Sequence, residues 1–150
     1  MTINLHRGTS LISRLIQWQT RSPYSHASLS LADNEIYESR EGHGVRCLSA
    51  LPAGERIDQF DFPHSDDAAR CLRPWLISQL GKPYDWTMVL RFITREQYSR
   101  EAKGHWFCSE LVYAALRKIG IELLARCEPW EVSPGLLSRS PLLKLRHRIL

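Results

Sequence analysis

The stretch Phe107-Cys108-Ser109-Glu110-Leu111-Val112 places a cysteine at the first residue of the most regular helical pattern in the chain. The pattern predicts a helix over residues 108–119, and Gly120 is a typical residue to end it. The unpaired N–H groups and the positive dipole at a helix start stabilise a thiolate and can hold an oxyanion. Cys108 is therefore the candidate nucleophile, and the amides near Cys108 and Ser109 are candidate oxyanion donors. The inward face of this helix is expected to carry Leu111, Val112, Ala115, Leu116 and Ile119.

A nucleophilic cysteine needs a base, and His26 is the candidate because it opens a segment in which apolar and polar residues alternate. Residues 26–31 and 35–38 predict two short strands joined by a turn at residues 32–34. Such a hairpin brings Glu38 next to His26, where the carboxylate can hold the imidazole in its working tautomer. The predicted site is therefore Cys108, His26 and Glu38.

Other assignments stay open for each of these positions. The register of the hairpin leaves Glu41 or His43 as alternatives to Glu38, and His105 is an alternative base that lies close to the cysteine in sequence. A single cysteine that opens an apolar helix is also often a buried core residue, and a histidine at a strand start is often structural.

The remaining periodicity predicts an α+β fold in which an antiparallel sheet packs against helices. Neither a linker nor an internal repeat interrupts the chain, so residues 1–150 are expected to form one domain. Further strands are predicted at residues 3–7, 45–48, 56–62 and 142–145, helices at residues 10–19, 66–80 and 85–94, and a loop at residues 95–104. The residues expected to face inward are Leu11, Leu15, Ile16 and Trp18 in the first helix and Ala69, Leu72, Leu76, Ile77 and Leu80 in the second, which also contains Pro74.

The composition is that of an ordinary globular protein, with 43% apolar and 24% charged residues. The net charge of +4 comes from scattered basic residues, so no nucleic-acid partner is expected, and the basic residues of 144–148 predict a solvated tail. No segment approaches the length of a membrane span or has the form of a signal peptide, which predicts a cytoplasmic protein without integral membrane association. The four cysteines show neither a C-x-x-C pair nor zinc-ligand spacing, so free thiols and no metal or other cofactor are expected.

Four segments together resemble permuted papain-like cysteine hydrolases, of the YiiX-like branch of the NlpC-type superfamily. They are Pro23–Leu29, which is similar to the histidine strand of that family, Gly81–Trp86, Phe107–Val112 and Val132–Leu137. The histidine precedes the cysteine, which is the order of the circularly permuted branch. The resemblance implies a permuted papain-like fold and a Cys108–His26–Glu38 triad. It also implies that Tyr84 and Tyr24 line the site, although both are equally suited to be core aromatics.

The function expected from these residues is thiol-dependent hydrolysis of an amide bond, for instance in a cell-wall peptide. The first alternative is hydrolysis or transfer of a lipid or acyl ester, because the relatives include enzymes of the lecithin-retinol-acyltransferase type. The second alternative is a non-catalytic binding protein that keeps the same fold. A peptide or acyl substrate is the partner that the first two functions imply.

Overall fold

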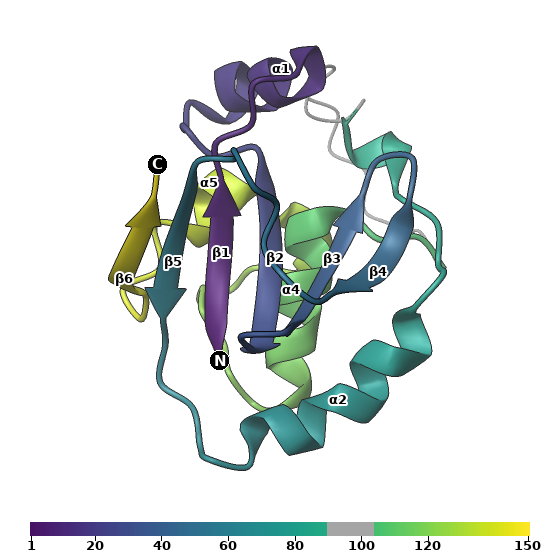
Figure 1. The fold of residues 1–150 in the computed structure, drawn as a ribbon, viewed down its shortest axis with the longest axis vertical. Helices are drawn as coiled ribbons and strands as arrows, with labels where there is room; N and C mark the ends of the chain where they lie inside the picture. The colour runs from purple at the N-terminus through teal and green to yellow at the C-terminus, as the bar shows by residue number, and fades with distance from the viewer. Residues whose placement is uncertain (90–103) are drawn as a thin grey trace.

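The computed structural model describes residues 1–89 and 104–150, and a six-stranded antiparallel sheet forms its centre (Figure 1). In sheet order the strands are β4 (Gly44–Leu48), β3 (Glu35–Arg40), β2 (His26–Ala32), β1 (Thr2–His6), β5 (Ile57–Asp61) and β6 (Lys144–Ile149). The described helices include α1 (Leu11–Thr20), α2 (Ala68–Gln79), α4 (Cys108–Lys118), the 3-10 helix η1 (Pro129–Glu131) and α5 (Pro134–Leu137). The predicted α+β class with an antiparallel sheet packed on helices is confirmed.

The two faces of the sheet differ in chemistry because side chains alternate along each strand. One face is apolar and packs against α4, which lies behind the sheet in Figure 1. The other face is polar and nevertheless buried. Its side chains include Asn4, His6, Ser28, Ser30 and Glu38, and the connection between β4 and β5 crosses in front of it.

The helices α1 and α2 bury fewer of their apolar side chains than the sequence predicts. In α1 only Ile16 is fully buried, whereas Leu11 and Trp18 are 85% and 70% exposed, because α1 lies beyond the end of the sheet (Figure 1). In α2 the expected Leu72 and Leu76 are in the core, but Ile77 and Leu80 are exposed. Pro74 lies inside α2, which begins two residues later than predicted.

The C-terminal basic segment is not a loose tail, as the sequence suggested, but the edge strand β6. It pairs with β5 and covers Lys144–Ile149 rather than residues 142–145. Arg146 lies 3.6 Å from Asp61, and Arg148 lies 3.8 Å from Asp58, so acidic residues of β5 hold the basic strand in place.

The predicted helix over residues 85–94 is described only in part. Residues 86–89 are helical, and the rest of that helix and the predicted loop up to residue 103 lie outside the described residues. Within the described ranges, no helix combines the length and the apolar character that a membrane crossing requires.

Gly44 fixes the segment that leads to Tyr84 against the edge of the sheet. The N–H of Val45 donates to the Lys82 carbonyl at 2.8 Å, and the N–H of Gly81 donates to the Val45 carbonyl at 2.9 Å. A Cβ at Gly44 would lie 2.3 Å from the Lys82 oxygen, and the φ of Gly44 is +67°. Only glycine combines this close approach with this backbone conformation.

Candidate active site

Cys108 is the first residue of α4, as predicted, and its side chain is completely buried. Hydrogen bonds on either side of it fix the start of the helix. The Phe107 N–H donates to Glu110 Oε2 at 3.2 Å, and Ser109 Oγ donates to the Val132 carbonyl at 2.6 Å. The Ser109 hydroxyl is therefore occupied by a structural hydrogen bond. Of the Ser109 donors, the backbone amide remains the candidate to bind an oxyanion.

His26 begins β2 and links Cys108 to Glu38. Its Nε2 lies 2.6 Å from Glu38 Oε2, and the Cys108 side chain is close enough to raise the pKa of the imidazole. Burial lowers the pKa of His26, but its interactions with Cys108 and Glu38 outweigh this effect and raise the pKa to about 10. The structure thus brings the three predicted residues together and favours an imidazolium beside the Glu38 carboxylate.

Glu38 is fully buried and is held from two sides. The register of β2 and β3 pairs it with Ser28, which places it diagonally across from His26 on the polar face. Arg46 Nε and Nη2 donate to Glu38 Oε1 at 2.9 and 2.7 Å, and Arg40 Nη1 lies 4.0 Å from Oε2. Burial raises the pKa of Glu38, but His26 and the two arginines outweigh it and lower the pKa to about 2. Glu38 is therefore a stable anion beside the imidazole.

The alternative residues lie elsewhere. The carboxylate at His26 is Glu38 rather than Glu41, and the imidazole beside Cys108 is His26 rather than His105. Glu41 and His43 lie in the turn between β3 and β4, where the His43 Nδ1 is 3.2 Å from the Glu41 carbonyl oxygen. His105 is exposed before α4 and faces a pocket that His43 also lines.

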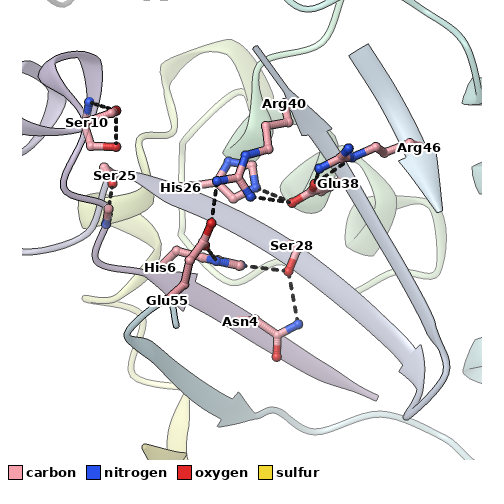
Figure 2. A network of polar contacts seen from close by, with 12 residues as sticks. Asn4, His6, Ser10, Ser25, His26, Ser28, Glu38, Arg40, Arg46 and Glu55 are labelled. Atoms are coloured by element: carbon pink, nitrogen blue, oxygen red, sulfur yellow. Dashed lines mark hydrogen bonds and ion pairs between the residues drawn. The ribbon is translucent and has the colours of Figure 1, made fainter. Parts of the chain in front are cut away.

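His6 is the part of the site that the sequence did not reveal. The pairing of β1 with β2 places it directly opposite His26, and the two rings lie edge to face with centroids 4.8 Å apart (Figure 2). His6 Nδ1 is 2.8 Å from Glu55 Oε2, and His6 Nε2 is 3.1 Å from Ser28 Oγ. Burial outweighs the neighbouring Glu55 and lowers the pKa of His6 to about 4, so this second imidazole is neutral near pH 7.

Glu55 joins the crossing segment between β4 and β5 to the polar face of the sheet. Its Oε2 contacts His6, and its Oε1 accepts from Arg40 Nη2 at 2.5 Å. Arg40 in turn lies beside Glu38, so polar contacts run from His26 through Glu38, Arg40 and Glu55 to His6, and the edge-to-face contact of the two imidazoles closes the ring (Figure 2). This ring restricts the orientation of the His26 imidazole.

Among the described residues, His6, His26 and Glu38 could together hold a metal ion. Each offers one ligand atom, and the three atoms lie within 4.8 Å of one another. Two imidazoles and a carboxylate are ligand types that suit zinc. However, Arg46 and Arg40 already neutralise Glu38, and their positive charge opposes a cation at this position.

The two predicted tyrosines lie in different surroundings. Tyr24 donates its hydroxyl proton to Asp58 Oδ2 at 2.6 Å and lies in the main core, under the guanidinium of Arg7. Tyr84 lies in the same apolar cluster as Cys108, and the negative charge of Cys108 contributes, after burial, to raising its pKa. The structure therefore places Tyr84, and not Tyr24, beside the thiol.

A pocket of about 670 Å³ adjoins this cluster. Tyr84 belongs to both, and the other lining residues include His43, Trp86 and His105. Cys108, His26 and Glu38 do not line this pocket themselves, and Tyr84 connects it to the cluster that contains Cys108.

The comparisons with known proteins give a structural match. No protein-family model matches the sequence, and no curated protein matches it either. The crystal structure of the metalloprotein YiiX from Escherichia coli O157:H7 matches with a TM-score of 0.73 at 18% sequence identity, over 99% of this chain and 96% of that one. At this identity the match concerns the fold, and we conclude that the chain has a YiiX-like fold.

Proposed function

We propose that the protein is a cysteine hydrolase that cleaves an amide bond through a thioester on Cys108. The observation that carries the proposal is that the His26 imidazole contacts Cys108 on one side and Glu38 on the other. A buried carboxylate, an imidazole and a thiol in this order form the relay used in nucleophilic catalysis. The permuted papain-like fold that the sequence resembles supports the same function.

In the proposed reaction, His26 holds the proton of Cys108 as an imidazolium, and the thiolate attacks the carbonyl carbon of the substrate. Because Glu38 is bonded to Nε2, the nitrogen that serves the thiol is Nδ1. The first amides of α4, at Cys108 and Ser109, stabilise the tetrahedral oxyanion. The imidazolium then protonates the leaving amine, and water hydrolyses the thioester with His26 as its base.

Glu38 has two tasks in this mechanism. It fixes the ring orientation and tautomer of His26, and its charge stabilises the imidazolium that forms when Cys108 is deprotonated. Arg46 and Arg40 keep Glu38 ionised despite its burial. The acyl part of the substrate is proposed to bind in the pocket beside Tyr84. This pocket would accommodate the acyl group of an amide or of an ester, so it is also compatible with the alternative ester substrate.

The proposal is tested by trapping the acyl-enzyme. In a Cys47→Ser, Cys71→Ser, Cys127→Ser background, Cys108 is the only thiol. We expect p-nitrophenyl acetate to release p-nitrophenol in a burst and to add one acetyl group to Cys108, detected by mass spectrometry of the intact protein. Adding His26→Ala is expected to remove the burst. A burst that survives this substitution, or the absence of any adduct in the folded background protein, would show that the relay does not activate the thiol.

A second candidate function is metal binding at His6, His26 and Glu38. Two observations favour it: the three ligand atoms lie within 4.8 Å of one another, and the structurally similar YiiX is described as a metalloprotein. Bound there, a divalent metal would supply a Lewis acid. Ligation of His26 at Nε2 keeps the proton on Nδ1, so the imidazole could not then accept the proton of Cys108.

The two candidates therefore exclude each other at His26, and zinc titration separates them. Isothermal titration calorimetry with Zn²⁺ and the His6→Asn variant tests whether His6 is a ligand. Tight one-to-one binding that is lost in this variant, together with suppression of the acetylation burst by zinc, would favour the metal site. A burst that zinc leaves unchanged would favour the hydrolase.

A further inference from the structure

A second cavity lies on the other side of the segment that carries Tyr84. The groove has a volume of about 490 Å³ and lies between α2, α4 and η1. The segment from Gly81 to Tyr84 contributes residues to both cavities. Gly81, Pro83 and Tyr84 line the pocket near Cys108, whereas Lys82 lines the groove, as does Trp106, the partner of Tyr84 in an isolated β-bridge. The groove is therefore separate from the candidate active site.

Three of the five tryptophans of the chain line this groove. Trp75 comes from α2, Trp106 from the residues before α4 and Trp130 from η1. Trp75 and Trp106 lie edge to face with centroids 5.7 Å apart. Indole rings offer large apolar surfaces at low entropic cost, and their concentration in a cavity of ligand size is typical of a binding site.

Two lysine ammonium groups lie near these indole rings and are not paired with a carboxylate among the described residues. The Lys82 ammonium lies 6.0 Å from the Trp106 ring centroid, and the Lys118 ammonium lies 5.8 Å from that of Trp75. Neither lysine has a carboxylate within 4.0 Å in the described part of the chain. The acidic residue of the groove, Glu128, is already paired with Arg117 at 2.7 Å. Two uncompensated ammonium groups therefore face the cavity.

The arrangement is fixed before any ligand arrives. Gln79 Oε1 accepts from Trp106 Nε1 at 3.1 Å and from Lys82 Nζ at 2.6 Å, which ties the ring and the ammonium to α2. The backbone of Trp106 is held as well, because its N–H donates to the Pro83 carbonyl and its carbonyl accepts from Asp85 and Ser39. A ligand that binds here does not bear the cost of ordering these groups.

We propose that this groove binds a small organic anion: its carboxylate or phosphate contacts the ammonium groups of Lys82 and Lys118, and its flat apolar body packs on the indole rings. Neither part alone satisfies the cavity, because an inorganic anion leaves the indoles uncovered and a neutral aromatic molecule leaves the charges uncompensated. The cavity volume matches a ligand rather than a protein surface.

The test uses 1-naphthyl phosphate as the probe and the indole N–H signals of ¹⁵N-labelled full-length protein as the readout. The indole signals of Trp75, Trp106 and Trp130 are expected to shift on titration, whereas those of Trp18 and Trp86, which lie outside the groove, serve as internal references. Inorganic phosphate and 1-naphthol are titrated in parallel, and each is expected to bind at least about tenfold more weakly than the complete probe.

Matched charge variants complete the experiment. The double variant Lys82→Met, Lys118→Met is expected to lower the affinity for 1-naphthyl phosphate by about tenfold, because each charge contributes somewhat less than 1 kcal/mol to binding. Lys144→Met, which removes a positive charge from the distant edge strand β6, is expected to leave the affinity unchanged. The proposal fails if the shifts are confined to Trp86, if 1-naphthol binds as tightly as its phosphate, or if Lys144→Met weakens binding as much as the double variant does.

Discussion

His6 and His26 face each other across β1 and β2. Near neutral pH the His6 imidazole is neutral, whereas the His26 imidazole is protonated. The ring centroids are 4.8 Å apart, yet the pKa of His6 is lowered to about 4 and that of His26 is raised to about 10. The difference comes from the neighbours of each ring. His26 has both Cys108 and Glu38, whereas for His6 the effect of Glu55 is smaller than that of burial and is partly cancelled by the charge of His26.

The neutral state of His6 predicts a loss of stability in mild acid. Since its pKa is about 4 in the folded protein and 6.5 in the unfolded chain, its contribution is present above pH 6.5 and lost as the pH falls towards 4. The free energy of unfolding should decrease over this window by up to about 3 kcal/mol. Glu38 and Glu55, whose pKa values fall from 4.5 to about 2, act in a lower window.

Urea unfolding at several pH values between 4 and 7 measures this contribution. In His6→Asn the slope of stability against pH should flatten over this window. The exposed His147→Asn variant provides the control and should keep the slope of the original protein. An unchanged slope in His6→Asn would mean that His6 is not held neutral by the fold.

Replacing Glu38 by glutamine should lower the pKa of His26 and slow acylation of Cys108. The amide keeps the shape of the side chain but removes the anion that supports the imidazolium and pairs with Arg46. Because a buried positive charge loses its partner, we also expect a destabilisation of about 3 kcal/mol. NMR titration of the His26 ring and the rate of the acetylation burst give the two readouts. Glu41→Gln, in the turn beyond β3, should change neither.

Alkylation at pH 6 should select Cys108 over the other thiols. An ordinary thiol with a pKa near 8.5 is less than about 1% ionised at this pH. Cys108 lies beside the His26 imidazole, whose pKa is raised to about 10, and its burial slows the approach of the reagent. Peptide mapping after brief exposure to iodoacetamide at pH 6 and pH 9 should therefore show Cys108 labelled at pH 6 and the exposed Cys47 and Cys71 labelled mainly at pH 9. The same pH dependence at every cysteine would argue against an activated nucleophile.

Substitution of Ser109 should affect stability more than chemistry. Its hydroxyl donates to the buried Val132 carbonyl, so Ser109→Ala should lower the free energy of unfolding by about 1–3 kcal/mol. The backbone amide proposed for the oxyanion remains, so the burst rate per folded molecule should stay within about twofold. Urea unfolding and the burst assay measure these two quantities separately. A large drop in the burst rate in fully folded protein would assign the hydroxyl a direct role.

The two tyrosines should separate into a structural and a functional residue. Tyr24→Phe removes the hydrogen bond to Asp58 and should cost about 1–2 kcal/mol of stability without changing the burst. For Tyr84, burial and nearby negative charges account for the raised pKa, without a hydrogen bond among the described residues. Tyr84→Phe should therefore leave stability within about 0.5 kcal/mol and slow the burst if its hydroxyl meets the substrate. A stability loss equal to that of Tyr24→Phe would place Tyr84 in the core only.

The parts of the site that the sequence predicts are those set by local structure. Cys108 is marked by the start of an amphipathic helix, and Glu38 is placed beside His26 by a hairpin in which only 12 positions separate the two residues. The sequence did not identify His6 as part of the site, because its position opposite His26 depends on the pairing of β1 with β2, which α1 separates in the sequence. Its neighbour Glu55 comes from a connection with no periodic pattern.

The same limit explains the errors in the fold. Helical periodicity identifies an apolar stripe on α1, but it does not determine where the helix packs. The helix lies beyond the end of the sheet, where Leu11 and Trp18 are exposed to solvent. The basic residues of β6 resemble a tail in composition, and the antiparallel pairing with β5, next to the acidic Asp58 and Asp61, makes them a strand. The permuted papain-like topology and the triad remain predictions that the experiments above address.

The order of the residues along the chain also has a consequence for the newly made protein. His6, His26 and Glu38 all belong to β1–β3, which are complete within the first 40 residues, whereas Cys108 follows much later. Domains generally fold as units. The proposed base and its carboxylate are therefore synthesised well before the proposed nucleophile, and His26 meets Cys108 only once α4 has packed behind the sheet.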